Sequence, residues 1–179
     1  MTDLARLVHA AQGGDRLALG ELYGQYARVV HGIVLSRAPR DAVEDLVQDV
    51  FVIAMERIGG LRDPEAFGGW LAAIARNRAT DYLRHAARTT GLTDDFERDG
   101  TPTLVDAASH PADAPDRIEA LAVLAAIRSL PEAYRETLML RLVEGMTGPE
   151  IAARTGLTPA SVRVNLHRGM KKLRERLDA

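Results

Sequence analysis

Apolar residues recur along this chain at helical spacing, and no segment alternates between apolar and polar residues over a useful length. The pattern predicts four helices in the first half of the chain, over 3–12, 15–36, 41–58 and 64–88. It predicts four more in the second half, over 116–129, 131–144, 149–155 and 159–177. We therefore expect an all-α protein with essentially no strand.

Two local signals support the predicted helix starts in the first half. Asp41 precedes the third helix, and Glu44 follows three residues later, which is the spacing of a capping box. Asp63 and Pro64 precede the fourth helix, and proline is suited to a first helical turn. We expect Asp41 and Asp63 to mark where these helices begin.

A long acidic stretch interrupts the helical pattern in the middle of the chain. Residues 89–117 contain seven acidic residues against two arginines, a net charge of −5, together with three prolines and two glycines. No helical or strand period runs through them, and so long an irregular stretch is unusual inside one domain. We expect an acidic flexible linker at 91–117 between two small helical domains, 1–90 and 118–179.

Composition excludes several classes of protein. The chain has 23 Lys and Arg against 25 Asp and Glu, and it contains no cysteine, which excludes disulfides and thiol catalysis. The histidines lack metal-ligand spacing, and neither a phosphate-binding loop nor a nucleophile elbow is present. No uncharged apolar run approaches the roughly 18 residues of a membrane span, and the N-terminus is not a signal peptide. We expect a cytoplasmic protein without membrane insertion, cofactor, metal or enzymatic activity.

The third predicted helix has a second face besides its apolar stripe. Val43, Leu46, Val50 and Ala54 belong to the stripe that must face the core. The other face carries acidic and amide side chains around one valine, and it is formed by Asp45, Gln48, Asp49, Val52 and Glu56. This face is either solvated with one stray apolar residue, or it binds a basic helix through an apolar centre and an acidic rim.

The fourth predicted helix carries a polar stripe, with Arg76 and Arg78 on its flanks. Asparagine and arginine on one side of a helix suit contacts with phosphates and base edges. Equally, an acid and an arginine three residues apart can form an ordinary intrahelical pair. The stripe consists of Asn77, Asp81, Arg84 and Arg88. Trp70 is interpreted as a core residue, with base stacking as the alternative.

The last two predicted helices have the pattern of a helix-turn-helix. Gly156 lies in the turn, Thr158 caps the second helix, and Val162 begins its buried stripe, which continues through Leu166, Met170, Leu173 and Leu177. The exposed side, with its flanks and cap, consists of Thr158, Ala160, Ser161, Arg163, Val164, Asn165, Arg168 and Lys171. In such a motif, the N-terminal part of the second helix reaches base edges in the major groove. The alternative is a helical hairpin with a solvated basic end.

Five segments in this order resemble the extracytoplasmic-function (group 4) sigma factors of bacterial RNA polymerase, in the sigma-70 superfamily. They are Asp45-Leu-Val-Gln-Asp-Val-Phe51, Phe67-Gly-Gly-Trp-Leu71, Ile74-Ala-Arg-Asn-Arg78, Leu130-Pro-Glu-Ala-Tyr-Arg135 and Val162-Arg-Val-Asn-Leu-His-Arg168. The resemblance spans nearly the whole chain. It implies a transcription initiation factor that binds core polymerase and directs it to specific promoters.

The resemblance also implies a role for each surface. The third-helix face corresponds to the part of sigma domain 2 that binds the clamp helices of the polymerase β′ subunit. Recognition of the promoter −10 element falls on Arg62, Asp63, Asn77, Arg78, Asp81 and Arg84. The helix-turn-helix corresponds to sigma domain 4, which recognises the −35 element and contacts the β flap. Family members are commonly held by an anti-sigma factor, which is therefore an implied partner.

Two other functions remain open from the residues themselves. A stand-alone helix-turn-helix regulator would need only 130–179 and would leave the first domain and the linker unused. A sigma-like adaptor would bind a regulator and never contact DNA, so its Arg163, Asn165 and Arg168 could be lost without effect. The sigma-factor hypothesis alone gives every segment a role.

Overall fold

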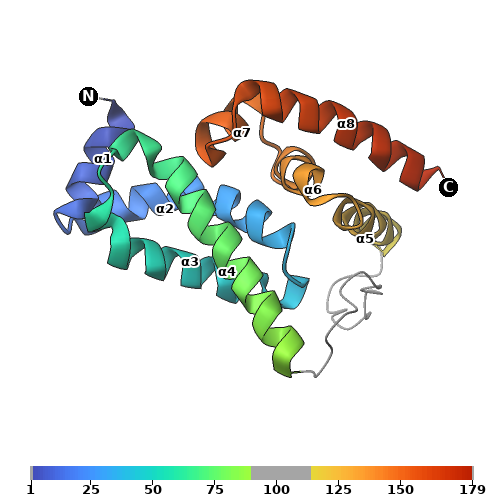
Figure 1. The fold of residues 1–179 in the computed structure, drawn as a ribbon, viewed down its shortest axis with the longest axis horizontal. Helices are drawn as coiled ribbons and strands as arrows, with labels where there is room; N and C mark the ends of the chain where they lie inside the picture. Colours follow the sequence, from blue (N-terminus) through green and yellow to red (C-terminus); the bar gives the residue numbers. More distant parts are fainter. Residues whose placement is uncertain (1, 90–113, 179) are drawn as a thin grey trace.

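A computed structural model describes residues 2–89 and 114–178, so residues 91–113 of the linker expected at 91–117 lie outside the described residues. The prediction is wrong for the last four residues of that linker, 114–117, which are helical. Within the described parts every regular element is helical, as predicted. The main helices are α1 (Asp3–Gln12), α2 (Arg16–Leu35), α3 (Val43–Arg57), α4 (Phe67–Thr89), α5 (Ala114–Arg128), α6 (Glu132–Leu138), α7 (Gly148–Thr155) and α8 (Pro159–Leu177). Figure 1 shows α1–α4 on one side and α5–α8 on the other. We call these the N-terminal unit and the C-terminal unit.

Side-chain caps define the starts of the first two helices. The Thr2 hydroxyl accepts a hydrogen bond from the backbone of Ala5 at the start of α1. The Asp15 carboxylate accepts from the backbone of Leu17 and Ala18 at the start of α2. These contacts satisfy amides that lack partners within the helix, and both helices begin within one residue of the predicted starts.

The predicted start of α3 is wrong. Residues Arg40–Ala42 form a 3-10 turn, and α3 begins after Ala42 without a side-chain cap. Asp41 lies inside this turn and not in the extended conformation of a cap, and Ala42 beside it is buried against the core. The Glu44 carboxylate lies 3.8 Å from the His31 ring instead of completing a capping box.

Three other boundaries differ slightly from the prediction. Asp63 caps a 3-10 turn, Pro64–Ala66, and α4 proper begins only at Phe67. The helix predicted over 131–144 is α6 followed by a π turn, Met139–Val143. The helix predicted from 116 begins two residues earlier, as α5. At each of these positions the chain is helical, but the turn is tighter or wider than in an α-helix or the helix end is displaced by a few residues. The spacing of apolar residues does not predict such details.

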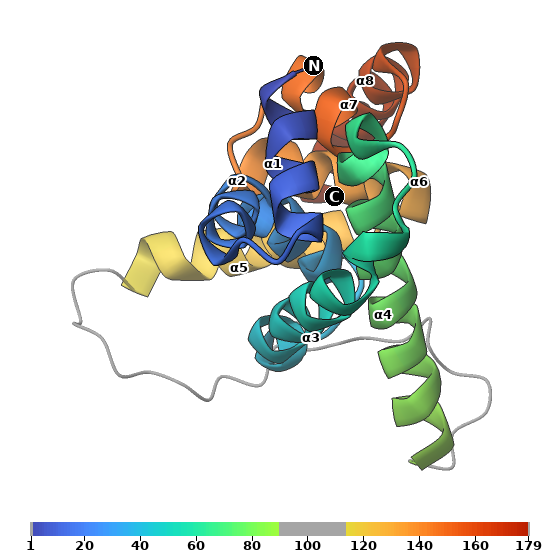
Figure 2. The ribbon, with the colours of Figure 1, turned by 90° about the vertical axis from the view of Figure 1, so that its left-hand side faces the viewer.

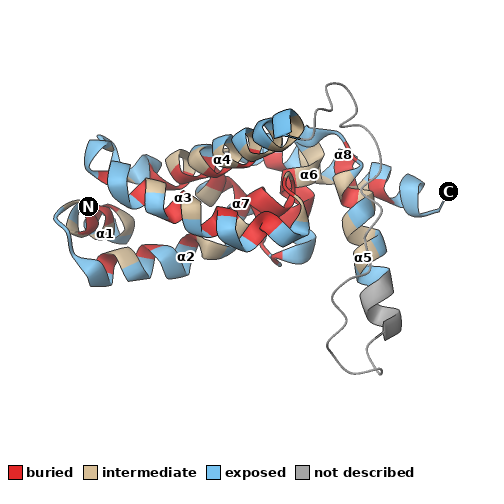
Figure 3. Ribbon diagram, turned by 90° about the horizontal axis from the view of Figure 1, so that it is seen from below, coloured by how far each residue is buried: buried red, intermediate tan, exposed pale blue. Residues whose placement is uncertain are grey.

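The two units pack against each other through one continuous apolar core. α6, the π turn and α7 lie against α2 and α4, as Figures 1 and 2 show. Fully buried side chains come from both units, including Ile33 and Leu71 from one and Leu138, Leu140 and Ile151 from the other. Figure 3 shows buried residues running through the contact between the units.

Glycines allow the two backbones to touch where α4 meets α7. A Cβ atom added to Gly68 would lie 2.9 Å from the Arg154 carbonyl oxygen. A Cβ added to Gly69 would lie 3.2 Å from the Cα of Gly156. Gly156 itself has φ +74°, the left-handed conformation that ends α7 and suits glycine. This close approach depends on both helix surfaces lacking side chains at these positions.

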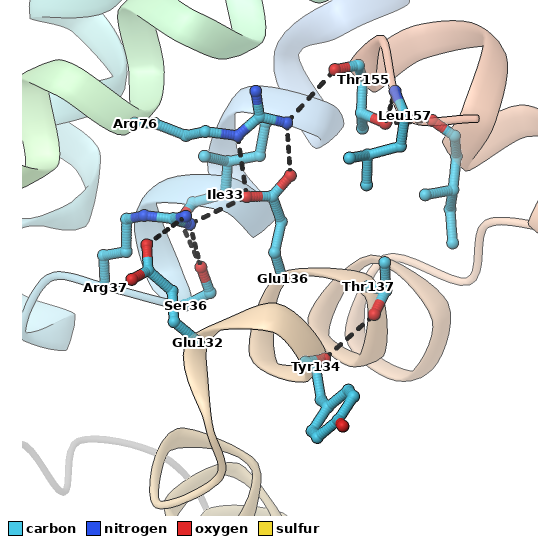
Figure 4. A network of polar contacts seen from close by, with 11 residues as sticks. Ile33, Ser36, Arg37, Arg76, Glu132, Tyr134, Glu136, Thr137, Thr155 and Leu157 are labelled. Carbon is cyan, nitrogen blue, oxygen red and sulfur yellow. Dashed lines mark hydrogen bonds and ion pairs between the residues drawn. The ribbon is translucent and has the colours of Figure 1, made fainter. Parts of the chain in front are cut away.

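A buried carboxylate joins the units on the polar side of the contact. Glu136 of α6 is 5% exposed, and Figure 4 shows the two guanidinium groups that surround it. Arg37 donates to it at 2.9 Å, and Arg76 donates through two nitrogens at 3.0 and 2.7 Å. The Arg76 guanidinium also donates to the Thr155 carbonyl, and the Glu136 carboxylate raises the pKa of Arg76. A buried charge of this kind is stable only while its partners stay in place.

A second carboxylate, Glu144, lies between His31 and Arg28 at the same contact. Its oxygens lie 2.6 Å from Nδ1 of His31 and 3.7 Å from Nε of Arg28. The hydrogen bond with Glu144 raises the pKa of His31, burial opposes this, and the charges of Glu144 and Glu44 add to the increase. The folded chain therefore favours the protonated ring.

This gives a prediction for stability against pH. Because the pKa of His31 is raised in the folded chain, its stabilising contribution is complete below its ordinary value of 6.5. That contribution is lost as the pH rises through the raised value. The free energy of unfolding, measured with urea from about pH 6 to pH 9, should fall across this interval.

His31→Gln should flatten that part of the profile, because glutamine does not titrate there. His9→Gln is the matched control, since His9 is exposed on α1 and should leave the profile unchanged. An equal pH dependence in His31→Gln and the wild type would contradict the assignment.

Candidate functional site

The polar face of α3 is solvent-exposed and has an apolar centre. Asp45, Gln48 and Glu56 are exposed, Asp49 is half-buried, and Val52 is 48% exposed. The stripe opposite them is buried, as the periodicity predicts. The face is therefore accessible to a partner, and the Val52 side chain at its centre is exposed to solvent.

The apolar centre is wider than the sequence analysis indicated. Met55 and Tyr23 are 50% and 48% exposed beside Val52. Together with Leu19 and Phe51 they line an apolar groove between α2 and α3. The spacing in the sequence could have predicted this wider apolar patch. Met55 follows Val52 by one helical turn on α3, and Tyr23 follows Leu19 by one turn on α2.

An ion pair joins two residues to which the sequence analysis gave different partners. The Arg78 guanidinium on α4 donates to the Asp49 carboxylate on α3, at 3.0 Å from Nε and 2.5 Å from Nη2. A polar groove between the two helices surrounds the pair, with Asp45, Gln48 and Tyr82 in its walls. The acidic face of α3 and the basic flank of α4 thus form one continuous surface.

The remaining residues of the proposed −10 surface lie along α4 and the loop before it. Arg62, Asn77, Asp81 and Arg84 are exposed. Arg84 lies 3.6 Å from Asp81, so the intrahelical pair considered above is present, between two largely exposed side chains. Such a pair contributes little stability and leaves both groups accessible.

Three residues at or near this surface are engaged within the protein. The Asp63 carboxylate is exposed, and one of its oxygens accepts from the backbone of Glu65. Trp70 is half-buried, with its ring 5.8 Å from that of Phe67, which supports the core interpretation of this tryptophan. Arg76, predicted to flank the stripe, points instead toward Glu136 of the C-terminal unit.

The helix-turn-helix consists of α7, the turn at Gly156 and α8. Thr147 and Glu150 form a capping box at the start of α7, and hydrogen bonds from Thr147 lower the pKa of Glu150. The Thr158 hydroxyl accepts from the backbone of Ser161 and so caps α8. Both helices therefore begin with hydrogen-bonded backbone amides.

The outward side of α8 is exposed and basic. Asn165 is half-buried, and the other predicted contact residues are exposed: Thr158, Ala160, Ser161, Arg163, Val164, Arg168 and Lys171. On the inner side, Val162 and Leu173 are buried, and Leu166 and Met170 are partly buried. The prediction for Leu177 is wrong: it is 49% exposed, because the helix end extends beyond the core. Gly169, which the prediction missed, packs against Leu138 and Tyr134.

The two charged surfaces lie on different sides of the molecule. α3 and α8 are far apart in Figures 1 and 2, with α4 and α7 between them.

Among residues 2–89 and 114–178 no group of three His, Cys, Asp or Glu side chains could hold a metal ion. Among the described residues, no helix is sufficiently long and apolar to span a membrane.

Two family models match the chain, and together they cover both units. Sigma-70 region 2 matches residues 22–89, and sigma-70, region 4 matches residues 120–173. The first covers α2 to α4, including the acidic face. The second covers most of the C-terminal unit, including the helix-turn-helix.

Curated relatives match nearly the full chain. The RNA polymerase sigma factor CarQ of Myxococcus xanthus is 33% identical, over 92% of this chain and 91% of its own. The ECF RNA polymerase sigma factor ShbA of Streptomyces griseus subsp. griseus is also 33% identical, over 97% and 94%. Among solved structures, CnrH of Cupriavidus metallidurans, in complex with the cytosolic domain of CnrY, is 26% identical with a TM-score of 0.65. That match covers 98% of this chain and 97% of CnrH.

The ion pair between Asp49 and Arg78 leads to a prediction. Both groups are partly exposed, so Asp49→Asn should lower the free energy of unfolding by at most about 1 kcal/mol. The loss should be smaller in high salt, because salt screens exposed charges. Urea unfolding at low and high salt measures both effects.

Asp45→Asn, on the same face of α3, is the matched control for the change in charge. A loss of several kcal/mol in Asp49→Asn alone would show that the fold depends on the pair. The surface could then not be substituted without unfolding the protein.

Proposed function

Because the chain belongs to the ECF RNA polymerase sigma factors of the sigma-70 family, we propose that it binds core RNA polymerase and directs it to specific promoters. The chain catalyses no reaction itself in this proposal, since RNA synthesis is carried out by the polymerase. It acts in the cytoplasm, where polymerase and DNA are found. The observation that carries the proposal is an acidic face with an apolar centre on the same chain as a basic helix-turn-helix.

The polymerase-binding surface of the proposal is the exposed face of α3. Asp45, Gln48, Asp49 and Glu56 form a rim that attracts basic side chains, and Val52 provides the apolar contact. Desolvated apolar centres with polar rims are the usual anatomy of a protein interface. We include Met55 and Tyr23, because they extend the exposed apolar centre around Val52. The expected partner is the pair of clamp helices of the β′ subunit.

The N-terminal unit also contacts the promoter −10 element in this proposal. Its exposed residues, Arg62, Asn77 and Arg84, offer donors to phosphates and base edges. Arg78 is held by Asp49, next to the polymerase-binding face. A polymerase side chain that pairs with Asp49 would therefore release Arg78 for DNA. Asp63 and Asp81 complete the proposed surface with hydrogen-bond acceptors.

The C-terminal unit recognises the −35 element through α8. Ser161, Arg163, Val164 and Asn165 lie in its first two turns, where a helix in the major groove meets base edges. Arg168 and Lys171 lie further along and suit phosphates or a base edge. The β flap of the polymerase is the expected protein contact of this unit.

An anti-sigma factor is a further proposed partner. The match to CnrH, solved in complex with the cytosolic domain of CnrY, supports a second protein that binds this chain. A stand-alone regulator is the alternative function, and it leaves the exposed groove around Val52 without a partner. Binding to core polymerase separates these two functions.

The first prediction concerns the face of α3. Val52→Arg should abolish co-elution with purified core RNA polymerase, because it places a cation in the apolar centre of the interface. The helical circular dichroism spectrum should stay unchanged, since Val52 is half exposed. Leu17→Arg is the matched control: Leu17 is 80% exposed on α2, and its substitution should leave co-elution intact. Co-elution of Val52→Arg equal to that of the wild type would remove this face from the proposal.

The second prediction concerns α8. Arg163→Ala or Arg168→Ala should cost about 1–3 kcal/mol of promoter binding at a base-contact position. The measurement is the affinity of the holoenzyme for a promoter found by transcribing genomic fragments in vitro. Arg6→Ala, an exposed arginine on α1, is the control. Unchanged affinity in both α8 variants would show that this side of the helix does not face the base pairs.

A further inference from the structure

The loop between α3 and α4 contains two adjacent glycines and two residues of the proposed −10 surface. Gly59 and Gly60 lie in the 3-10 turn Ile58–Gly60, and Arg62 and Asp63 follow it. A Cβ atom added to either glycine would meet nothing within 4 Å, so the turn is open to solvent on that side. Glycine restricts the backbone least, and such a segment holds one conformation only through contacts made from elsewhere.

Gln12, the last residue of α1, makes such contacts. Its side-chain nitrogen donates to the Ile58 carbonyl at 2.9 Å and to the Leu61 carbonyl at 2.8 Å. Both carbonyls can only accept, so the amide must turn its NH₂ group, which has two hydrogens, toward them. The oxygen of the same amide lies 3.1 Å from Nδ1 of His9. One side chain thus joins the first and last carbonyls of the segment Ile58–Leu61, with both glycines between them.

The hydrogen bond to Leu61 also fixes the direction of the next backbone amide. The Leu61 carbonyl and the Arg62 N–H belong to one peptide unit, and the described residues contain no cis peptide bond. In a trans peptide the C=O and N–H bonds point in opposite directions. Gln12 therefore directs the Arg62 N–H away from α1. Within residues 2–89 and 114–178 this N–H makes no hydrogen bond, and Arg62 is exposed, so the group is accessible to a ligand.

α1 contacts the other end of the loop as well. The Thr2 hydroxyl, which caps α1, donates to the Glu65 carboxylate. Glu65 belongs to the 3-10 turn Pro64–Ala66, which the Asp63 carboxylate caps. Figure 1 shows α1 beside the connection from α3 to α4. The sigma-70 region 2 match begins at residue 22, so it does not include α1 and assigns it no role.

We propose that Gln12 is a positioning residue for recognition of the −10 element. Its amide holds the segment Ile58–Leu61 in the conformation in which Arg62 presents its N–H and its guanidinium to acceptor atoms of the DNA. The inference rests on the proposed function, because that function places this loop against the −10 element. Gln12 acts through the loop backbone and contacts no base itself.

The expected defect is confined to one promoter element. Without the Gln12 donors, the two glycines let the loop exchange among several conformations, and only some of them present Arg62 correctly. The preference for the correct −10 sequence should therefore decrease. α8 belongs to the other unit and makes no contact with Gln12, so recognition of the −35 element should be unaffected.

Two substitutions at position 12 separate the hydrogen bonds from the shape of the side chain. Gln12→Met keeps an unbranched chain of similar length but has no donor. Gln12→Lys restores donors on a flexible stem that can reach both carbonyls. Glutamine, methionine and lysine have similar helix propensities, so α1 should form in both variants, with unchanged circular dichroism.

The matched control is Gln25→Met, the same chemical change in α2. Gln25 is exposed, and its side chain makes no hydrogen bond within the described residues. Its substitution should change neither the loop nor promoter recognition.

The measurement is the affinity of each holoenzyme for a promoter found by transcribing genomic fragments in vitro. The same promoter with its −10 element replaced, and with its −35 element replaced, gives the discrimination at each element as a ratio of affinities. Gln12→Met should lower the discrimination at −10 about tenfold, because two neutral hydrogen bonds are lost. It should leave the discrimination at −35 unchanged. Gln12→Lys and Gln25→Met should keep both ratios of the wild type.

NMR order parameters of the free chain test the positioning step separately. The values for the Gly59, Gly60 and Arg62 amides should fall in Gln12→Met. They should stay at the wild-type level in Gln12→Lys and in Gln25→Met.

Several results would overturn the inference and leave the proposed function standing. They are wild-type discrimination at −10 in Gln12→Met, an equal loss at −10 and −35, and unchanged order parameters in the loop. A loss in Gln12→Lys as large as that in Gln12→Met would also overturn it, because the donors would then not be the cause. Absence of polymerase binding and of promoter-directed transcription in the wild type would overturn the proposed function, even if Gln12 orders the loop of the free chain.

Discussion

The buried carboxylate of Glu136 is the interaction on which the arrangement of the whole molecule depends. Arg37 reaches it from the turn after α2 and Arg76 from α4, so a single side chain of the C-terminal unit contacts two separate segments of the other unit. Its burial requires the surrounding apolar core to be complete. The position of the helix-turn-helix relative to the N-terminal unit follows from this requirement and from the backbone contact at Gly68.

The two outward surfaces have opposite charge and different chemistry. α3 presents carboxylates around an apolar groove, which suits a basic protein helix. α8 presents arginines and small polar side chains, which suit DNA. The Asp49–Arg78 pair connects the first surface with the flank of α4, so the proposed polymerase-binding and −10 surfaces meet at one residue pair. The near-neutral total of 23 basic and 25 acidic residues is therefore compatible with separate surfaces of opposite sign.

The helices and their buried faces followed from the sequence, because apolar spacing and polar caps act locally. The stripe of α3 and the cap at Thr158 are examples. The contact between the units did not follow, because Glu136 and Arg76 look like ordinary surface residues until the fold brings them together. The contact between Gly68 and Gly156 and their neighbours could not be predicted for the same reason, since a close backbone approach depends on a partner distant in the sequence. The residue roles at the candidate surfaces remain proposals, although the exposure of Val52 and Arg168 agrees with them.

The most direct test of this account is the structure of the chain bound to core RNA polymerase and promoter DNA, determined by electron cryomicroscopy. The account predicts α3 against the clamp helices and α8 in the major groove of the −35 element. A complex in which α3 and α8 contact neither polymerase nor DNA would contradict the account as a whole.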